Sequence, residues 1–220
     1  MSKCAFIGLG VMGFPMAGHL AKAGLSVTVF NRNGAKAEAW CQTYAGQKAD
    51  TPRAAAQGAD FVFTCVGNDD DLRAVVLGED GALAGMREGA ILIDHTTTSA
   101  EVARELATAC QAQSCTMLDA PVSGGEAGAV NAALTIMVGG EPETYAQAEP
   151  VMAHFARASK LLGAAGAGQL TKMVNQICIG GLVQGLAEGL NFAQKAGLDG
   201  HAIIDTISKG AAQSWQMENR

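Results

Sequence analysis

Short apolar runs alternate with helix-like segments through the first half of the chain. The first two runs, Cys4–Ile7 and Val27–Phe30, flank a glycine-rich turn and a segment of helical character. Later runs of the same kind predict strands at Asp60–Val66, Ala90–Asp94, Thr116–Asp119 and Leu134–Val138. Strands that alternate with helices indicate a parallel, doubly wound sheet, which is an α/β fold.

The segments between these runs carry the start signals of helices. Thr51 precedes Pro52, and a hydroxyl cap followed by proline at the first helical position is typical of a helix start. Three further segments predict helices by their pattern: Asp69–Leu77, Ser99–Gln113 and Glu141–His154.

The pattern changes near residue 168. The segment Gln169–Ala196 lacks proline and repeats apolar residues at helical spacing, so it predicts one helix about 42 Å long. Gly181, Gly185 and Gly189 recur at every fourth position, which indicates a smooth face packed against a neighbouring helix. Asp199 is a residue type that caps helices, and it predicts the start of another one.

These patterns divide the chain into two parts. We predict an α/β domain over residues 1–163. An all-helical domain over residues 164–220, for substrate binding or oligomerisation, follows and is entered through the long interdomain helix.

The turn after the first apolar run is the most specific motif. Strand, G-x-G-x-x-G turn, helix and strand fit within residues 3–32, as a dinucleotide-binding unit requires. In such a unit the first glycine permits a tight turn, the second allows a pyrophosphate to approach, and the third allows close helix packing. The predicted contacts are Gly8, Leu9, Gly10, Val11, Met12 and Gly13, and the alternative is a glycine-rich turn that packs without a ligand.

The end of the second strand bears on the choice of dinucleotide. NAD enzymes usually carry Asp or Glu there, which accepts a hydrogen bond from the ribose 2′-hydroxyl. This chain has Asn31 and Arg32 instead, and a guanidinium can hold a 2′-phosphate and stack on adenine. We therefore predict that residues 1–163 form an NADP-binding Rossmann domain and that NADP(H) is preferred. Alternatively Arg32 is a solvated charge and both cofactors are accepted, and Lys36 is either a second phosphate contact or an exposed helix lysine.

Composition excludes several other classes. The net charge is −6 and there is no block of basic residues, which disfavours binding to nucleic acid or an anionic membrane. Six cysteines and four histidines are scattered without metal-ligand spacing, so no metal site is predicted. The uncharged stretches fall short of a membrane span. Because the first strand starts at once, without room for a signal peptide, we expect a soluble cytoplasmic protein.

Three segments at predicted strand ends carry candidate ligands. The segment Cys65–Asp69 brings the backbone of Val66 and Gly67 toward the cofactor. In Asp94–Ser99, hydroxyl groups meet the nicotinamide or its ribose, although helix capping explains Thr98 and Ser99 as well. The small residues of Asp119–Gly125 form a nest of N–H groups for a carboxylate, or a simple loop.

The long helix contributes a candidate acid or base. Lys172 lies in its first turn among apolar neighbours and shares one face with Asn175 and Gln176. Most helix lysines are solvated and structural. A partly desolvated lysine, however, shifts its pKa and can exchange a proton with an alkoxide.

Three motifs in order give the chain a family resemblance. The chain resembles the β-hydroxyacid dehydrogenases in the sequence and spacing of three motifs, GLGVMGFPMAGHL, DAPVSGG and GAGQLTKMVNQ. The resemblance implies that Lys172 is the catalytic acid/base and that Asn175 orients the substrate. It also implies that Ser123, Gly124 and Gly125 bind the substrate carboxylate, and that Thr96 lies beside the nicotinamide.

Two departures from the family pattern stand out. Gln176 occupies a position where family members often have a second asparagine. Family members also usually run further, so we expect this sequence to be a fragment or the ordered part of a longer chain. Since the long apolar helix needs cover, we expect a homodimer or homotetramer.

The leading hypothesis is an oxidoreductase that links NADP(H) to a short β-hydroxyacid or its semialdehyde. A second hypothesis is a non-catalytic NADP-binding or redox-sensing module. The 6-phosphogluconate dehydrogenases are a weaker enzyme alternative. They resemble the chain at VSGGEAG, but they carry histidine at the position of Asn175 and need a basic phosphate pocket.

Overall fold

A six-stranded parallel sheet forms the centre of the first part of the protein. In the computed structural model, which describes residues 2–219, the strands run in the order β3-β2-β1-β4-β5-β6. Their bounds are β1 Lys3–Ile7, β2 Ser26–Phe30, β3 Gln47–Lys48, β4 Phe61–Thr64, β5 Ile91–Asp94 and β6 Thr116–Asp119. Strand order reverses between β1 and β4, and open α/β sheets bind ligands at the carboxyl ends of the strands at such a point. The predicted doubly wound sheet is confirmed.

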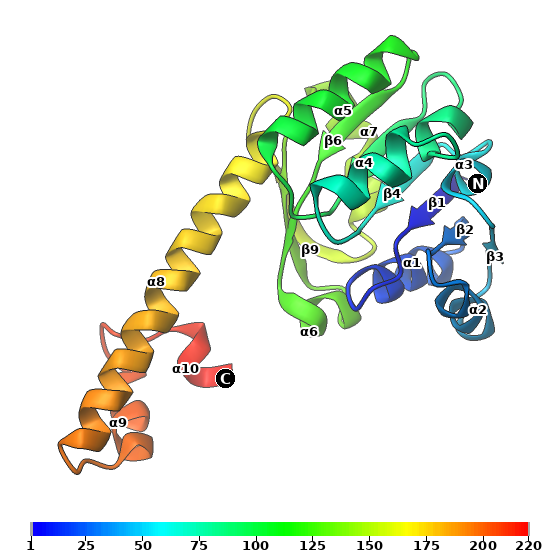
Figure 1. Cartoon of the computed structure of the whole chain (residues 1–220). Coiled ribbons are helices and arrows are strands. Elements are labelled where there is room, and N and C mark those ends of the chain that lie inside the picture. The colour runs from blue at the N-terminus through cyan, green and yellow to red at the C-terminus, as the bar shows by residue number, and fades with distance from the viewer. Residues whose placement is uncertain (1, 220) are drawn as a thin grey trace. The chain divides into compact units, whose positions relative to one another are not determined.

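Helices cover both faces of this sheet. One face packs against α1 (Gly13–Lys22), α2 (Gly34–Thr43) and α7 (Pro142–Met152), with Trp40 and Met16 fully buried. The other face packs against α3 (Pro52–Ala56), α4 (Asp69–Leu77) and α5 (Ala100–Ala112). Figure 1 shows α4 and α5 in front of the sheet and α7 behind it. The central strands β1, β4 and β5 are therefore buried on both faces, which explains why they are continuous apolar runs.

A second, smaller sheet lies beyond β6. It contains β7 (Val122–Ser123), β8 (Leu134–Val138) and β9 (Ala156–Leu161), with β7 antiparallel and β9 parallel to β8. The short helix α6 (Gly125–Val130) connects β7 to β8. The prediction of a strand at 134–138 is confirmed, but this strand lies outside the six-stranded sheet.

Side-chain caps fix most of the predicted helix starts. Thr51, Asn68 and Ser99 each accept a hydrogen bond from a backbone N–H in the first turn of α3, α4 and α5. Asn33 does the same for α2, a helix that the apolar pattern did not predict. The caps hold the strand-to-helix turns, which are the places where the candidate site residues lie.

The chain divides into two units, Met1–Lys172 and Met173–Arg220. Helix α8 (Ala167–Lys195) begins in the first unit and continues into the second, which also holds α9 (Gly200–Ile207) and α10 (Trp215–Asn219). The division falls later along the chain than the boundary expected at 163/164, and the roles assigned to the two domains stay predictions.

The second unit has an apolar face on α8. Asp199 caps α9, as expected, by accepting from the N–H groups of His201 and Ala202. A Cβ atom added at Gly181, Gly185 or Gly189 would meet nothing within 4 Å. The expectation that these glycines pack tightly against another helix is therefore wrong within this unit. They line an apolar cavity of about 460 Å³ instead.

None of the helices in residues 2–219 combines the length and the apolar character needed to cross a bilayer.

Candidate functional site

The glycines of the loop between β1 and α1 have different surroundings: two are closely packed, and one faces open space. Gly8 has φ +99°, and a Cβ there would collide with the carbonyl group of Cys65. A Cβ at Gly13 would collide with the carbonyl oxygen of Gly8 and press on the ring of Phe6. At Gly10 a Cβ would meet nothing within 4 Å. Gly8 and Gly13 are thus needed by the fold, whereas Gly10 leaves a gap that a ligand can fill.

The start of α1 is suited to an anion. Met12 is the N-cap residue, and its side chain makes no capping hydrogen bond. The first N–H groups of a helix have no partner within the helix, and together with the helix dipole they attract phosphate. The loop and the helix start therefore fit a dinucleotide pyrophosphate.

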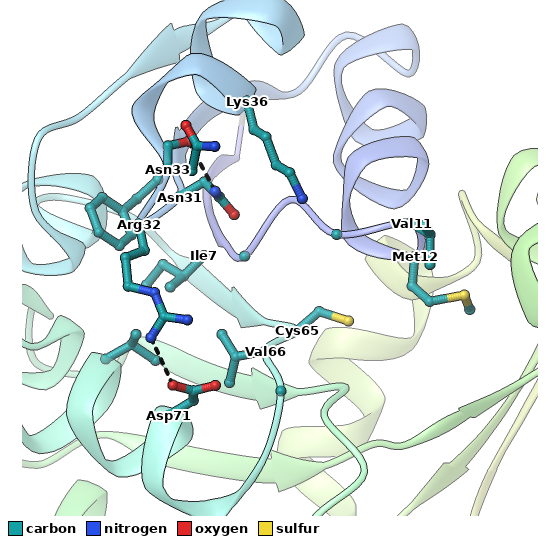
Figure 2. Close-up of a pocket in the computed structure, with 15 residues that line it drawn as sticks. Ile7, Val11, Met12, Asn31, Arg32, Asn33, Lys36, Cys65, Val66 and Asp71 are labelled. Carbon is teal, nitrogen blue, oxygen red and sulfur yellow. Dashed lines mark hydrogen bonds and ion pairs between the residues drawn. The ribbon is translucent and has the colours of Figure 1, made fainter.

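A pocket of about 480 Å³ opens beside this loop, at the carboxyl ends of β1, β2 and β4. Figure 2 shows its side chains, with Lys36 extending toward the glycine-rich loop and Arg32 extending toward Asp71. Eight of the predicted cofactor residues line the pocket, and Lys36 joins them: Gly8, Gly10, Val11, Met12, Asn31, Arg32, Val66 and Gly67. One pocket thus brings together residues from three separate strand ends.

Three predicted cofactor residues lie behind the pocket wall. Leu9 is buried, and its N–H donates to Oδ1 of Asn31 over 2.9 Å. Gly13 packs against Gly8. Thr96 is buried, and its Oγ1 accepts from the N–H of Val66 over 3.1 Å. These residues hold the backbone of the pocket in place, and their side chains are absent from its lining.

Asp71 is a pocket residue that the sequence reasoning missed. It lies in the first turn of α4, and its Oδ1 accepts from Arg32 Nη1 over 3.0 Å. The end of β2 carries no carboxylate, but the fold places one beside it from a different strand-to-helix turn. The acidic run Asp69–Asp71 was visible in the sequence, yet nothing in it identifies the member that faces the pocket.

Lys172 lies in a second cluster within the first unit. Its side chain is 9% exposed, and its Nζ donates to the carbonyl oxygen of Val122 over 2.9 Å. None of the ion pairs between described residues involves it. Burial lowers the pKa of this amine. A lysine in this state can exchange a proton more readily than a solvated one.

The segment that Lys172 contacts has the backbone of an anion nest. Val122 precedes Ser123, and the next two residues, Gly124 and Gly125, have φ of +137° and +62°. Both angles favour glycine, because a side chain would strain the backbone there. Successive N–H groups in such turns create a concave site for an anion. The structure therefore brings the predicted acid/base next to the predicted carboxylate site.

Buried polar groups fix the start of α8. The carboxylate of Asp119 accepts from the N–H groups of Gly166 and Gln169 over 2.8 and 2.9 Å. The fully buried side chain of Gln169 donates to the carbonyl of Thr96 over 2.7 Å and accepts from the N–H of Thr98. The turn that carries Lys172 is thereby tied to the loop after β5. The sequence offers no signal for these contacts, since Gln and Asp are usually exposed.

Asn175 follows Lys172 by three positions along α8 and belongs to the second unit. Its Nδ2 donates to Oε1 of Gln176 over 2.9 Å. The two amide side chains are thus paired with each other.

A buried carboxyl group lies at the end of β5. Asp94 is fully buried, and its Oδ1 accepts from Thr64 Oγ1 and from the N–H of Thr96. Burial raises its pKa to about 7. Next to it, burial lowers the pKa of His95 to about 4, and the Nδ1–H of His95 donates to the carbonyl of Ala120.

These two pKa shifts predict opposite pH dependences. Because the pKa of Asp94 is higher in the folded protein, its protonation stabilises the fold. This stabilisation is fully present below pH 3.8, the ordinary pKa of the group, and is lost as the pH rises toward about 7. The lowered pKa of His95 makes the free energy of unfolding rise as the pH increases from about 4 to 6.5. We therefore compare the free energies of unfolding of the wild type and of Asp94→Asn. We expect the difference, wild type minus variant, to fall by on the order of 4 kcal/mol between pH 3.8 and about 7.

Urea unfolding at a series of pH values measures this difference, because His95 contributes equally to both proteins. The control is Asp70→Asn, whose side chain is 97% exposed. A constant difference between wild type and Asp94→Asn across this range would contradict the assignment.

The doubly wound sheet, the glycine-rich loop and the pocket at the strand-order reversal define a dinucleotide-binding protein. Comparison with known proteins narrows this class. The protein-family model described as the NAD-binding domain of 6-phosphogluconate dehydrogenase matches residues 3–179. The model described as NAD-binding of NADP-dependent 3-hydroxyisobutyrate dehydrogenase matches residues 166–220.

Relatives and solved structures agree with these matches. An uncharacterized oxidoreductase of Shewanella frigidimarina is 66% identical over 220 residues, which cover 100% of this chain and 76% of that protein. The 3-hydroxyisobutyrate dehydrogenase of Pseudomonas aeruginosa is 37% identical, with coverage of 99% and 72%. The structure of Mycobacterium tuberculosis 3-hydroxyisobutyrate dehydrogenase with L-serine has a TM-score of 0.90 and 33% identity, with coverage of 100% and 74%.

The chain belongs to the β-hydroxyacid dehydrogenase family. It is accordingly an oxidoreductase of the hydroxyacid dehydrogenase type, and its cofactor is a nicotinamide dinucleotide. The predicted family resemblance and the predicted cofactor class are confirmed.

Proposed function

We propose that the protein transfers hydride between NADP(H) and a short β-hydroxyacid or its semialdehyde, with Lys172 as the general acid/base. The observation that carries this proposal is the contact of Lys172 Nζ with the carbonyl of Val122 at the edge of the Ser123–Gly125 nest. A carboxylate held in the nest lies close to a desolvated amine, which is the arrangement that proton exchange at a nearby hydroxyl group requires.

The proposed role of Lys172 follows from its surroundings. When bound, the nicotinamide supplies or accepts the hydride. In the reducing direction the ammonium form of Lys172 protonates the nascent alkoxide of the substrate. In the oxidising direction the neutral amine removes the hydroxyl proton. Burial lowers the pKa of Lys172, which makes the neutral form more accessible near neutral pH.

The proposed substrate class rests on the nest and on the family. The N–H groups and hydroxyl of Ser123–Gly125 suit a carboxylate, and holding it supplies the orientation that hydride transfer needs. The role of Asn175 in orienting the substrate is carried over from the family. L-serine, present in the M. tuberculosis structure, is itself a β-hydroxyacid and fits this class.

The proposed preference for NADP(H) rests on charge in the pocket. Arg32 lines the pocket beside the end of β2, where the 2′ position of the adenosine ribose lies in proteins of this fold. Lys36 lines the same pocket and is the second candidate contact to phosphate. Because Asn31 is uncharged and engaged by Leu9, it offers no carboxylate against a 2′-phosphate. The proposal includes NAD(H) as a second, less preferred cofactor.

A steady-state assay of the intact protein tests the proposal. In the reducing direction the assay uses NADPH or NADH with one of four aldehydes: glyoxylate, succinic semialdehyde, methylmalonate semialdehyde or tartronate semialdehyde. In the oxidising direction it uses L-serine with NADP or NAD. We expect turnover of at least one substrate and a higher kcat/KM with NADP(H). Cofactor binding without turnover of any of these would support a non-catalytic binding module instead.

We also propose that the protein forms a homodimer or homotetramer. Apolar side chains of α8 are exposed within the second unit, among them Val174, Ile177 and Val183. Exposed apolar surface of this kind marks interaction sites. Light scattering of the intact protein would give the oligomeric state, and a monomer at all concentrations would overturn this proposal.

A further inference from the structure

The adenosine end of the cofactor pocket holds two opposite charges in contact. Arg32, which follows β2, donates to the carboxylate of Asp71 from α4 (Figure 2). Both side chains line the pocket. The carboxylate that many NAD enzymes place at the end of the second strand is missing from that strand, yet a carboxylate reaches the same pocket from α4.

Asp71 is the fixed member of the pair. Its side chain is 30% exposed, and its own backbone N–H donates to Oδ1 of Asn68 over 2.8 Å. Asn68 Nδ2 lies 3.4 Å from Asp71 Oδ2. The same Oδ2 would lie 2.7 Å from a Cβ at Gly67, so the carboxylate occupies the space above this glycine. The cap of α4 and the backbone of Gly67 thus hold Asp71 against the pocket wall.

Arg32 is the movable member. Its side chain is 87% exposed, and Asp71 is its only ion-pair partner among the described residues. An exposed pair of this kind contributes little to stability, so the guanidinium can exchange one anion for another at small cost. When Arg32 leaves for a 2′-phosphate, Asp71 loses its partner and stays close to the phosphate, where like charges repel.

We propose that Asp71 is a specificity-determining residue that weakens NADP(H) binding and favours NAD(H). It competes with the 2′-phosphate for Arg32, and it offers a carboxylate oxygen to the 2′-hydroxyl of NAD(H). The inference rests on the proposed role of Arg32 as the phosphate contact. It explains how one pocket accommodates both cofactors: Arg32 binds the 2′-phosphate of NADP(H), and Asp71 accepts a hydrogen bond from the 2′-hydroxyl of NAD(H).

The test is the dissociation constant of the intact protein for NADPH and for NADH, measured by cofactor fluorescence at low ionic strength. Asp71→Asn keeps the size of the side chain and the backbone cap of α4, and removes only the charge. We expect it to bind NADPH about three- to tenfold more tightly, the size of effect expected from an exposed ion pair together with a nearby repulsion. NADH binding should become weaker.

The matched control is Asp70→Asn, which removes the same charge from the same helical turn. Its side chain is 97% exposed and does not line the pocket. If both variants tighten NADPH binding equally, the effect is a general one of net charge and the proposal is wrong. Weaker NADPH binding by Asp71→Asn would also overturn it, because Asp71 would then be aligning Arg32 for the phosphate.

Arg32→Ala separates the proposal from the function on which it rests. If Arg32→Ala binds NADPH as the wild type does, the proposed NADP(H) preference fails and the competition fails with it. If Arg32→Ala weakens NADPH binding but Asp71→Asn does not improve it, only the role of Asp71 is wrong. We expect the gain from Asp71→Asn to shrink in the double variant, where there is no guanidinium left to release.

Discussion

Replacing Lys172 by alanine is expected to lower kcat by at least ~100-fold, the usual contribution of a general acid/base. Its binding of NADPH should hardly change, since Lys172 does not line the cofactor pocket. Lys172→Arg should be nearly as slow. A guanidinium keeps the charge but does not release its proton at neutral pH, so this variant distinguishes proton exchange from charge alone.

Steady-state kinetics with the best substrate, together with a fluorescence titration of NADPH, checks both halves of this expectation. Lys160→Ala is a suitable control, because Lys160 is an exposed lysine on β9. Near-normal turnover of Lys172→Ala would remove Lys172 from the mechanism. A parallel loss of cofactor affinity would instead show that the substitution disturbs the Rossmann domain.

Two substitutions in the glycine-rich loop should have opposite consequences. Gly13→Ala places a methyl group against the carbonyl of Gly8 and the ring of Phe6, so we expect the unfolding free energy to fall by about 1–3 kcal/mol. Gly10→Val adds a larger side chain where no protein atom lies within 4 Å. It should fold normally but lose affinity for NADPH and NADH, because its side chain occupies the space left for the pyrophosphate.

Denaturant unfolding and cofactor titration of the same two proteins separate these effects. The comparison is internally controlled, since both changes fall in one loop and both replace glycine. Unimpaired cofactor binding by Gly10→Val would mean that the pyrophosphate does not approach the loop there. A fully stable Gly13→Ala would mean that α1 can shift without cost.

The central strands were predictable because both faces of the sheet are covered. Cys4–Ile7 and Ala90–Asp94 could be recognised as apolar runs, and the structure has β1 and β5 there. Strand β9 escaped prediction because its sequence, ARASKL, has no such run, and none of its residues is fully buried. The apolar pattern gave no bounds for α2, the helix that carries Lys36, because only Ala37 and Trp40 are buried, too few for a clear apolar stripe.

The candidate site was predictable where a residue acts through its own backbone or its position after a strand. Gly8 and Gly10 are of this kind, and they line the pocket as the motif implies. Asp71 and Gln169 are different, since their contacts join segments far apart in the chain: Asp71 meets Arg32, and Gln169 meets the loop after β5. Local pattern carries no information on such pairings, so they emerge only with the fold.

We propose above all that this protein moves hydride between a bound nicotinamide and a small carboxylate-bearing substrate. The most direct test uses NADPH deuterated at C4, on either face in separate reactions, with the four aldehydes named above. Mass spectrometry and NMR then locate the deuterium. We expect one deuterium on the former carbonyl carbon of at least one product, from one of the two labelled faces, and we expect Lys172→Ala to form this product at least ~100-fold more slowly. Tight NADPH binding with no deuterium in any product would contradict it.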